Sequence, residues 1–444
     1  MATLVYAPPA SREQRHSRLW HNAGWNLCGT VLPMTIGVFV IPRLIQQLGA
    51  SRFGVLTIAW SLVGYLSLFD FGMGRSLTKL IAERLGSGDV SEIPKLWSGS
   101  ILLITAQGIV GGGLLALIAP WLSRSALKMP QALQSDARLS LYVVALIVPI
   151  VTSSACLRGY LEAYCAFPAL NVVKICLGVA GFLGPLLAMQ VSRTASAAIL
   201  TILVARLLAW IGYFCLCLWT AGHPFRICLL SRRELAMIVR LGGWMTISNL
   251  VSPLMNSLDT FLIGALVSVS QVQYYSIPAD VVTKGLLIPS SLAAVLFPVF
   301  SSMILVDRRQ TEKLYWRSLL ILAAWLTPFV LFCGFLAKPG LSLWLGADFA
   351  LHGYKVAQVV AIGVFANGIA SVPFALIQAS GRPDITAKIH LVELPLYAVA
   401  VYILTTHLGV LGTAIAWTAR TSLDAILLLK YSPVRMKVTR VALQ

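Results

Sequence analysis

Residues 67–85 read SLFDFGMGRSLTKLIAERL and place an acid, Asp70, at the end of a long apolar run. The preceding stretch, 55–69, carries no charge, whereas basic residues follow between Arg75 and Arg84. A change from apolar to basic sequence is typical of the cytoplasmic end of a membrane-spanning helix. We therefore interpret Asp70 as the inner end of a span and 75–84 as the basic cytoplasmic loop that follows it.

The composition of the whole chain supports a membrane environment. Hydrophobic residues make up 58% of the 444 positions and charged residues only 11%, with a mean hydropathy of +0.83. Soluble domains carry about 25% charged residues. Apolar runs long enough to cross about 30 Å of hydrocarbon recur along the sequence. The N-terminus lacks a signal-peptide pattern, so we expect the first span to remain in the mature protein.

Twelve apolar runs predict an all-α polytopic membrane protein, because helices satisfy their own backbone hydrogen bonds in a bilayer. Their edges lie at charged residues or at Pro and Gly. The first six predicted spans are Gly24–Pro42, Val55–Gly74, Trp97–Leu117, Leu139–Leu157, Leu170–Met189 and Ser196–Leu218. The second six are Gly242–Val267, Ile277–Ile304, Leu319–Leu336, Val356–Gln378, Ile385–Leu404 and Leu408–Leu428.

The distribution of basic residues predicts the orientation of these spans. Alternate segments, beginning with the N-terminal tail, hold 22 Lys and Arg residues against 8 in the others, when Lys388 is counted with the loop before it. Basic residues collect in cytoplasmic loops. We therefore expect both termini in the cytoplasm. The formal charge of +18 then reflects the loops, and we expect no nucleic-acid partner.

The span count and a basic central segment predict two six-helix lobes. We place the N-terminal lobe at 1–220, a cytoplasmic linker at 221–241 and the C-terminal lobe at 242–444. A shift of 219 positions aligns NAGWN (22–26) with LGGWM (241–245), which is a weak internal repeat. Such repeats are common in transporters, whose substrate sites lie between the two halves.

Several protein classes are disfavoured by what this sequence lacks. It has no GxxxxGK[ST] phosphate loop, and no predicted loop is long enough for an ATPase domain or a glycosyltransferase active site. The eight cysteines and the histidines show no metal or redox spacing. We therefore expect neither an enzyme nor a cofactor or metal site.

Charges within the predicted spans are the candidate functional residues, because such charges are costly and usually face a polar cavity. Arg206 and Arg420 fall near mid-membrane, each with aromatic residues at helical spacing on its own span. Cations beside aromatic rings suit a sugar phosphate. The predicted substrate-binding residues are Arg206, Arg420, Lys284, Trp210, Trp417, Asn256 and Asn367.

A second group of predicted residues couples transport to an ion. Glu393 lies mid-span, with His390 three positions before it and Tyr397 four positions after it. A buried carboxyl group can carry a proton, and a neighbouring imidazole can relay it. The predicted ion-coupling residues are Glu393, His390, Asp259 and Asp70.

Simple charge neutralisation is the alternative interpretation of several of these charges. Asp280 with Lys284, and Arg420 with Asp424, are four positions apart and therefore share a helix face. Asp70 could likewise cap a helix or pair with a basic residue of the following segment.

Three stretches give the chain its family resemblance. They are 44–86 (LIQQLGASRFGVLTIAWSLVGYLSLFDFGMGRSLTKLIAERLG), 158–175 (RGYLEAYCAFPALNVVKI) and 341–354 (LSLWLGADFALHGY). In this order, with twelve spans, they resemble Wzx-type oligosaccharide flippases, the polysaccharide-transport branch of the multidrug/oligosaccharidyl-lipid/polysaccharide exporter superfamily. The resemblance runs through nearly the whole chain.

The resemblance implies ion-driven movement of an undecaprenyl-pyrophosphate-linked oligosaccharide across the bacterial inner membrane for surface polysaccharide synthesis. Membrane lipids and polysaccharide polymerase or chain-length proteins are the implied partners. A second interpretation is an antiporter of small cationic compounds with the same architecture. Two mid-membrane arginines against one glutamate favour the anionic substrate. A membrane scaffold without transport activity fits the polar stripes poorly.

Overall fold

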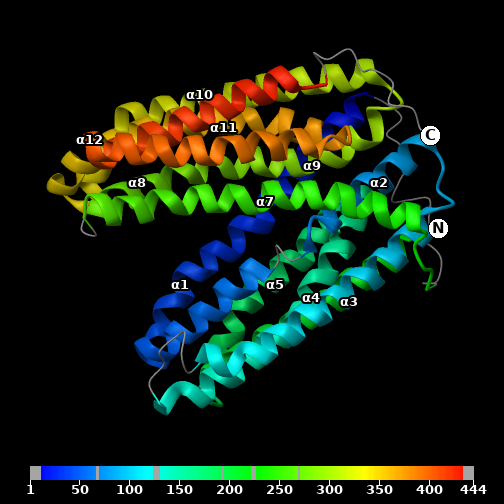
Figure 1. Ribbon diagram of the computed structural model, residues 1–444, viewed down its shortest axis with the longest axis horizontal. Coiled ribbons are helices and arrows are strands. Elements are labelled where there is room, and N and C mark those ends of the chain that lie inside the picture. Colours follow the sequence, from blue (N-terminus) through cyan, green and yellow to red (C-terminus); the bar gives the residue numbers. More distant parts are fainter. Residues whose placement is uncertain are drawn as a thin grey trace. The chain divides into compact units, whose positions relative to one another are not determined.

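The computed structural model describes residues 12–66, 70–123, 131–192, 194–221, 227–268 and 271–433. Within these residues all regular elements are helices, which confirms the all-α prediction. The chain divides into two compact units, Met1–Gly243 and Trp244–Gln444. Figure 1 shows the helices of both units, which are described separately below.

Unit 1 is built around α4, which contacts α2, α3 and α6. α5 contacts α1 and α6. Its helices are α1 (Arg12–Leu66), α2 (Met73–Ser87), α3 (Ile93–Trp121), α4 (Gln131–Ala163), α5 (Phe167–Ala188), α6 (Ala195–Ala221) and the first turns of α7 (Arg232–Leu266).

The stretch that follows Asp70, predicted as a basic cytoplasmic loop, is helical. Asp70 accepts a hydrogen bond at Oδ1 from the backbone N–H of Gly72, at 3.0 Å. Gly72 has φ 66°, and α2 begins at the next residue. Leu77 and Ile81, one turn apart, are both fully buried, so one face of this helix packs inside the protein. Lys79 pairs with its own helix neighbour Glu83, at 2.5 Å.

α2 approaches α4 closely at a pair of glycines. A Cβ atom on Gly159 would lie 2.4 Å from the carbonyl oxygen of Gly74. A Cβ atom on Gly74 would in turn lie 2.8 Å from the carbonyl oxygen of Ala155. Small residues let helix backbones approach in this way within membranes. The crossing therefore depends on glycine at both positions.

Unit 2 is centred on α11, which contacts α8, α9, α10 and α12. Besides the C-terminal part of α7, its elements are α8 (Val272–Thr283), the 3-10 helix η5 (Lys284–Leu286), α9 (Leu287–Met303), α10 (Arg308–Leu345), α11 (Ala347–Ala379) and α12 (Pro383–Tyr431). η5 precedes Pro289, which has no N–H to donate to the carbonyl of Gly285. This missing donor favours the local change from α to 3-10 geometry.

α12 consists of two helices joined by a sharp reversal at Gly409, which has φ 59° and ψ −141°. The Oγ1 atoms of Thr405 and Thr413, on either side of the reversal, lie 2.7 Å apart. Figure 1 shows the two halves, orange and red, running alongside each other. The hairpin places residues more than 30 positions apart in contact, as the 3.8 Å approach of His390 to Asp424 shows.

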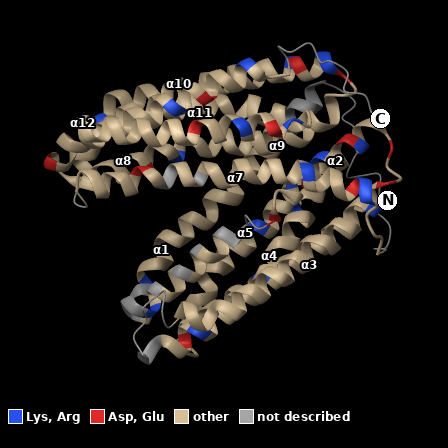
Figure 2. Ribbon diagram, viewed as in Figure 1, with Lys and Arg blue, Asp and Glu red and all other residues tan. Residues whose placement is uncertain are grey.

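The predicted spans fall on these helices. Ten helical segments of the described residues are long and apolar enough to cross a membrane, and Val55–Gly64 is a shorter apolar segment. α1 carries the first predicted span and the first part of the second, Val55–Gly74, which was predicted to extend past the end of α1 at Leu66. α12 carries the last two predicted spans. α7 begins at Arg232, so the second part of the predicted 221–241 linker is helical. Charged positions are sparse along the helices (Figure 2).

Candidate functional site

Unit 2 contains a buried polar cluster whose centre is Asp259 on α7. Tyr275 of α8 donates its hydroxyl to Oδ2 of Asp259 at 2.5 Å. Tyr397 of α12 donates its hydroxyl to Oδ1. All three side chains are buried. Because each carboxylate oxygen accepts from a different helix, Asp259 ties α7, α8 and α12 together.

Arg420, on the second half of α12, lies against this group. Its Cζ atom is 5.3 Å from the ring centroid of Tyr397, a cation–π contact. Nη1 lies 3.7 Å from the sulfur of Met255 on α7. Nε is buried and has no hydrogen-bond partner among the described residues. The predicted neutralising pair with Asp424 does not form an ion pair within the described part of unit 2.

Glu393, His390 and Asp424 form the second part of the cluster. His390 and Glu393 lie three positions apart on the first half of α12, and Asp424 faces them from the second half. His390 Nε2 is 3.8 Å from Asp424 Oδ1, and its ring stacks on Phe374 of α11 with 6.0 Å between centroids. One ligand atom from each of the three side chains lies within 4.8 Å of the others.

Glu393 is the most isolated of these groups. Its side chain is only 2% exposed, and neither carboxylate oxygen has a hydrogen-bond donor among the described residues. Buried polar atoms in proteins nearly always have partners, and a buried charge without one is costly. Glu393 is therefore a site where a cation, a proton or a substrate group would be stabilised.

The other predicted residues of unit 2 lie outside this cluster or at its edge. Trp417 is buried against α11 at Gly363, where a Cβ atom would lie 2.4 Å from Cζ3 of its ring. Asn367 is half-buried on α11. Lys284 lies in η5 and is exposed, as is Asp280, and no ion pair joins these two described residues. The side chain of Asn256 falls outside the described residues.

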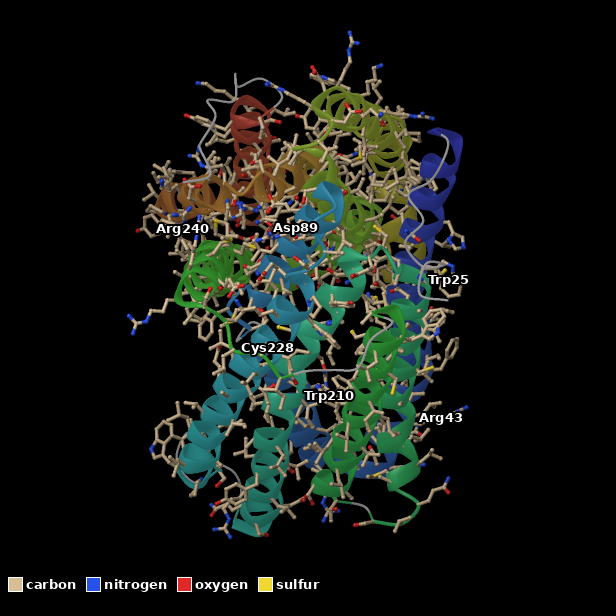
Figure 3. All side chains as sticks on the ribbon, turned by 90° about the vertical axis from the view of Figure 1, so that its right-hand side faces the viewer. Trp25, Arg43, Asp89, Trp210, Cys228 and Arg240 are labelled. Carbon is tan, nitrogen blue, oxygen red and sulfur yellow. The ribbon has the colours of Figure 1, made fainter. Side chains whose placement is uncertain are left out.

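Unit 1 holds the remaining predicted residues. Arg206 on α6 has a buried Nε without a hydrogen-bond partner in the described part of the chain. One turn later, Trp210 donates its indole N–H to Ser153 on α4 at 2.9 Å (Trp210 is labelled in Figure 3). Its ring stacks on Phe214 with 5.2 Å between centroids. Trp210 therefore fixes α6 against α4 beside the unpartnered arginine.

Two features of the cluster were not identified from the sequence. Tyr275 precedes the predicted start of span eight at Ile277, and no local pattern links it to Asp259. Pairing of Asp424 with Arg420 was one alternative, and the structure also brings Asp424 opposite His390, with Oδ1 3.8 Å from Nε2. The helical spacing of Glu393 and Tyr397 did indicate that these two side chains share one face.

Comparisons with known proteins give the chain its family. The family described as polysaccharide biosynthesis protein matches residues 40–351. A putative O-antigen transporter of Shigella flexneri is 31% identical over 412 residues, which cover 92% of this chain and 96% of that protein. A probable flippase, AglR, of Haloferax volcanii is 28% identical over 206 residues, covering 43% of this chain and 40% of that protein.

Solved structures share the architecture. A crystal structure of MATE in complex with MaL6 matches with a TM-score of 0.83 and 14% identity, covering 98% of each chain. The Vibrio cholerae MATE transporter VcmN in its bent form matches with a TM-score of 0.76 and 16% identity, covering 93% of this chain and 96% of that one. These likenesses show a MATE-like fold. Together with the sequence matches, they show that this multi-pass membrane protein belongs to the polysaccharide biosynthesis protein family.

Proposed function

We propose that the chain is an ion-driven flippase that moves a polyprenyl-pyrophosphate-linked oligosaccharide across the bacterial inner membrane for surface polysaccharide synthesis. Its near full-length similarity to a putative O-antigen transporter supports this substrate class. The structural observation that carries the proposal is the buried, unpartnered Glu393 beside Arg420 within α12. A charged residue within a membrane span costs stability, so one that is present usually serves a function.

In this proposal, Arg206 and Arg420 bind the anionic headgroup of the lipid. Arg206 and Arg420 each keep a buried Nε without a partner among the described residues, so each has a donor available for a phosphate oxygen. The planar guanidinium group binds phosphate through two parallel hydrogen bonds. Trp210 and Trp417, on the same helices, position the arginines or stack on sugar rings. Further polar contacts to the substrate would come from Lys284, Asn256 and Asn367.

We assign ion coupling to the acidic part of the cluster. Glu393 would bind the driving proton, because protonation leaves no net charge on a buried carboxyl group. His390 would relay the proton to Glu393. Asp259 already accepts two tyrosine hydrogen bonds and acts as the anchor for the helices around the site. Asp70, which caps a turn through Gly72, would act at the cytoplasmic side.

The topology belongs to the same proposal. Both termini would lie in the cytoplasm, and the two units would act as lobes of six helices that alternate access to the substrate. Polysaccharide polymerase and chain-length proteins are the partners that would receive the exported oligosaccharide.

One observation favours a second function, an antiporter of small cationic compounds. The cluster in unit 2 contains three carboxyl groups, Asp259, Glu393 and Asp424, against the single guanidinium group of Arg420. The MATE-like fold is also compatible with this function. Protection of cells from cationic dyes would support it, whereas restored surface polysaccharide would support the flippase.

Complementation tests the proposal. The chain is expressed in a bacterial strain that lacks its own O-antigen transporter, and surface polysaccharide is measured. We expect the wild type to restore it. Arg206→Ala combined with Arg420→Ala should abolish it at unchanged protein levels in the membrane. Full activity of this double variant would refute the headgroup role.

A further inference from the structure

The α12 hairpin brings together the side chains that a transition-metal ion binds. His390 and Glu393 are three positions apart, so both project from one face of the first half. Asp424 projects toward them from the second half, with Oδ1 3.8 Å from His390 Nε2. The three groups offer one imidazole nitrogen and two carboxylate oxygens, all within 4.8 Å of one another.

Most polar atoms of the three side chains lack partners. Both oxygens of Glu393 and Oδ1 of Asp424 are buried without a hydrogen-bond partner among the described residues. His390 would bind through Nε2, the nitrogen 3.8 Å from Asp424, and its Nδ1 is also buried without a partner there. Glu393 and His390 are 2% and 7% exposed as whole residues. A protein interior rarely leaves so many polar atoms unsatisfied in one place. An additional ligand would therefore satisfy several atoms at once.

The charges around the hairpin leave room for a dication. Arg420 interacts electrostatically with all three carboxyl groups, Asp259, Glu393 and Asp424. When ionised, three carboxylates against one guanidinium group leave two negative charges, which one divalent cation would neutralise. The side chain of Asp424 is 15% exposed, more than that of His390 at 9%.

We propose that His390, Glu393 and Asp424 form a binding site for a first-row divalent transition metal, of which Zn²⁺ is the representative. Imidazole nitrogen combined with carboxylate oxygen favours such metals, whereas Mg²⁺ and Ca²⁺ prefer oxygen ligands alone. Three protein ligands and one water molecule are a common zinc arrangement.

The site would contract when it binds zinc. With metal–ligand distances of about 2.0–2.2 Å, two ligand atoms of one tetrahedral zinc ion lie about 3.3–3.6 Å apart. His390 Nε2 and Asp424 Oδ1 lie 3.8 Å apart, close to this separation. All three ligand atoms lie within 4.8 Å of one another, so side-chain rotation would bring them together by at most about 1.5 Å. The stacking of His390 on Phe374 holds the imidazole in place.

This inference does not rest on the proposed function, because metal binding is measured on the purified protein without transport. It does bear on that function: a bound metal and the coupling proton would compete for the same oxygen atoms of Glu393.

Zinc titration tests the site directly. The full chain, purified in detergent without a histidine tag, is titrated with ZnCl₂ by calorimetry. We expect one high-affinity zinc ion per chain. His390→Asn, Glu393→Gln and Asp424→Asn should each weaken binding at least about tenfold, because each removes a ligand. His407→Asn, which changes an exposed histidine on the same hairpin, is the matched control and should bind as the wild type does.

X-ray absorption at the zinc edge of the wild-type protein gives a result that needs no variant. We expect one imidazole nitrogen, with oxygen atoms for the remaining ligands. Sulfur ligands, or two or more imidazoles, would overturn the proposal. The absence of high-affinity binding by the wild type, or equal binding by the folded site variants, would overturn it too.

Discussion

The hydrogen bond from Tyr397 to Asp259 yields a quantitative prediction for Tyr397→Phe. The substitution removes one of the two hydroxyl groups that donate to a carboxylate of 2% exposure. A hydrogen bond to a charged group contributes about 1.5–3 kcal/mol to stability. A loss of 1 kcal/mol lowers Tm by about 2–4 °C in a unit of about 200 residues. We therefore expect Tyr397→Phe to lower Tm by about 3–12 °C.

The assay is thermal unfolding of the purified protein in detergent, followed by intrinsic fluorescence. Tyr402→Phe is the matched control, because Tyr402 lies on the same helix, is 53% exposed and has no hydrogen bond among the described residues. It should change Tm by no more than about 1–2 °C, as surface substitutions usually do.

A double-mutant cycle sharpens this test. Tyr275→Phe should lower Tm by a similar amount. The double variant should lower Tm by more than the two single variants together, because Asp259 then loses both hydroxyl donors. If Tyr397→Phe unfolds at the same temperature as Tyr402→Phe, the hydroxyl group does not stabilise Asp259 and the anchoring role is wrong.

Three further predictions address other parts of the molecule. The double variant Arg420→Asp with Asp424→Arg, which exchanges the two charges, should fail to restore surface polysaccharide, whereas Arg420→Lys should keep partial function. Full activity of the double variant would mean that charge neutralisation alone matters. Gly159→Ala should destabilise unit 1 by about 1–3 kcal/mol in denaturant unfolding, because the added Cβ would lie 2.4 Å from the carbonyl oxygen of Gly74. Unchanged stability would contradict the close crossing of α2 and α4. A reporter fused at Asp348 should read periplasmic and one at the C-terminus cytoplasmic; the reverse would overturn the orientation.

Much of the fold could be predicted from hydropathy because the bilayer imposes helix length and internal hydrogen bonding on each apolar run. The exceptions lie where tertiary packing determines the structure. Residues 75–84 are charged enough to suggest a loop, yet Leu77 and Ile81 bury one face of α2 against neighbouring helices. The first turns of α7, from Arg232, were likewise assigned to the linker because their arginines interrupt the apolar run.

The candidate site was predictable only in part, for a similar reason. Glu393 and Arg420 stand out because a charge within a span is rare, whatever its surroundings. Tyr275 does not stand out, since its contact with Asp259 depends on how α8 packs beside α7. The predicted break between Leu404 and Leu408 indicated a turn close to Gly409. The approach of Asp424 to His390 depends on how the two halves of α12 pack against each other, which hydropathy does not define.

The most direct test of ion-driven flipping is transport by Glu393→Gln in proteoliposomes. A fluorescent polyprenyl-pyrophosphate oligosaccharide is placed in one leaflet, and its movement is followed with and without an imposed proton gradient. We predict that the gradient accelerates flipping by the wild type. The Gln variant should bind the lipid but flip it at a rate independent of the gradient. Gradient-dependent flipping by the Gln variant would contradict the coupling role of Glu393, and failure of the wild type to move the lipid would contradict the proposed function itself.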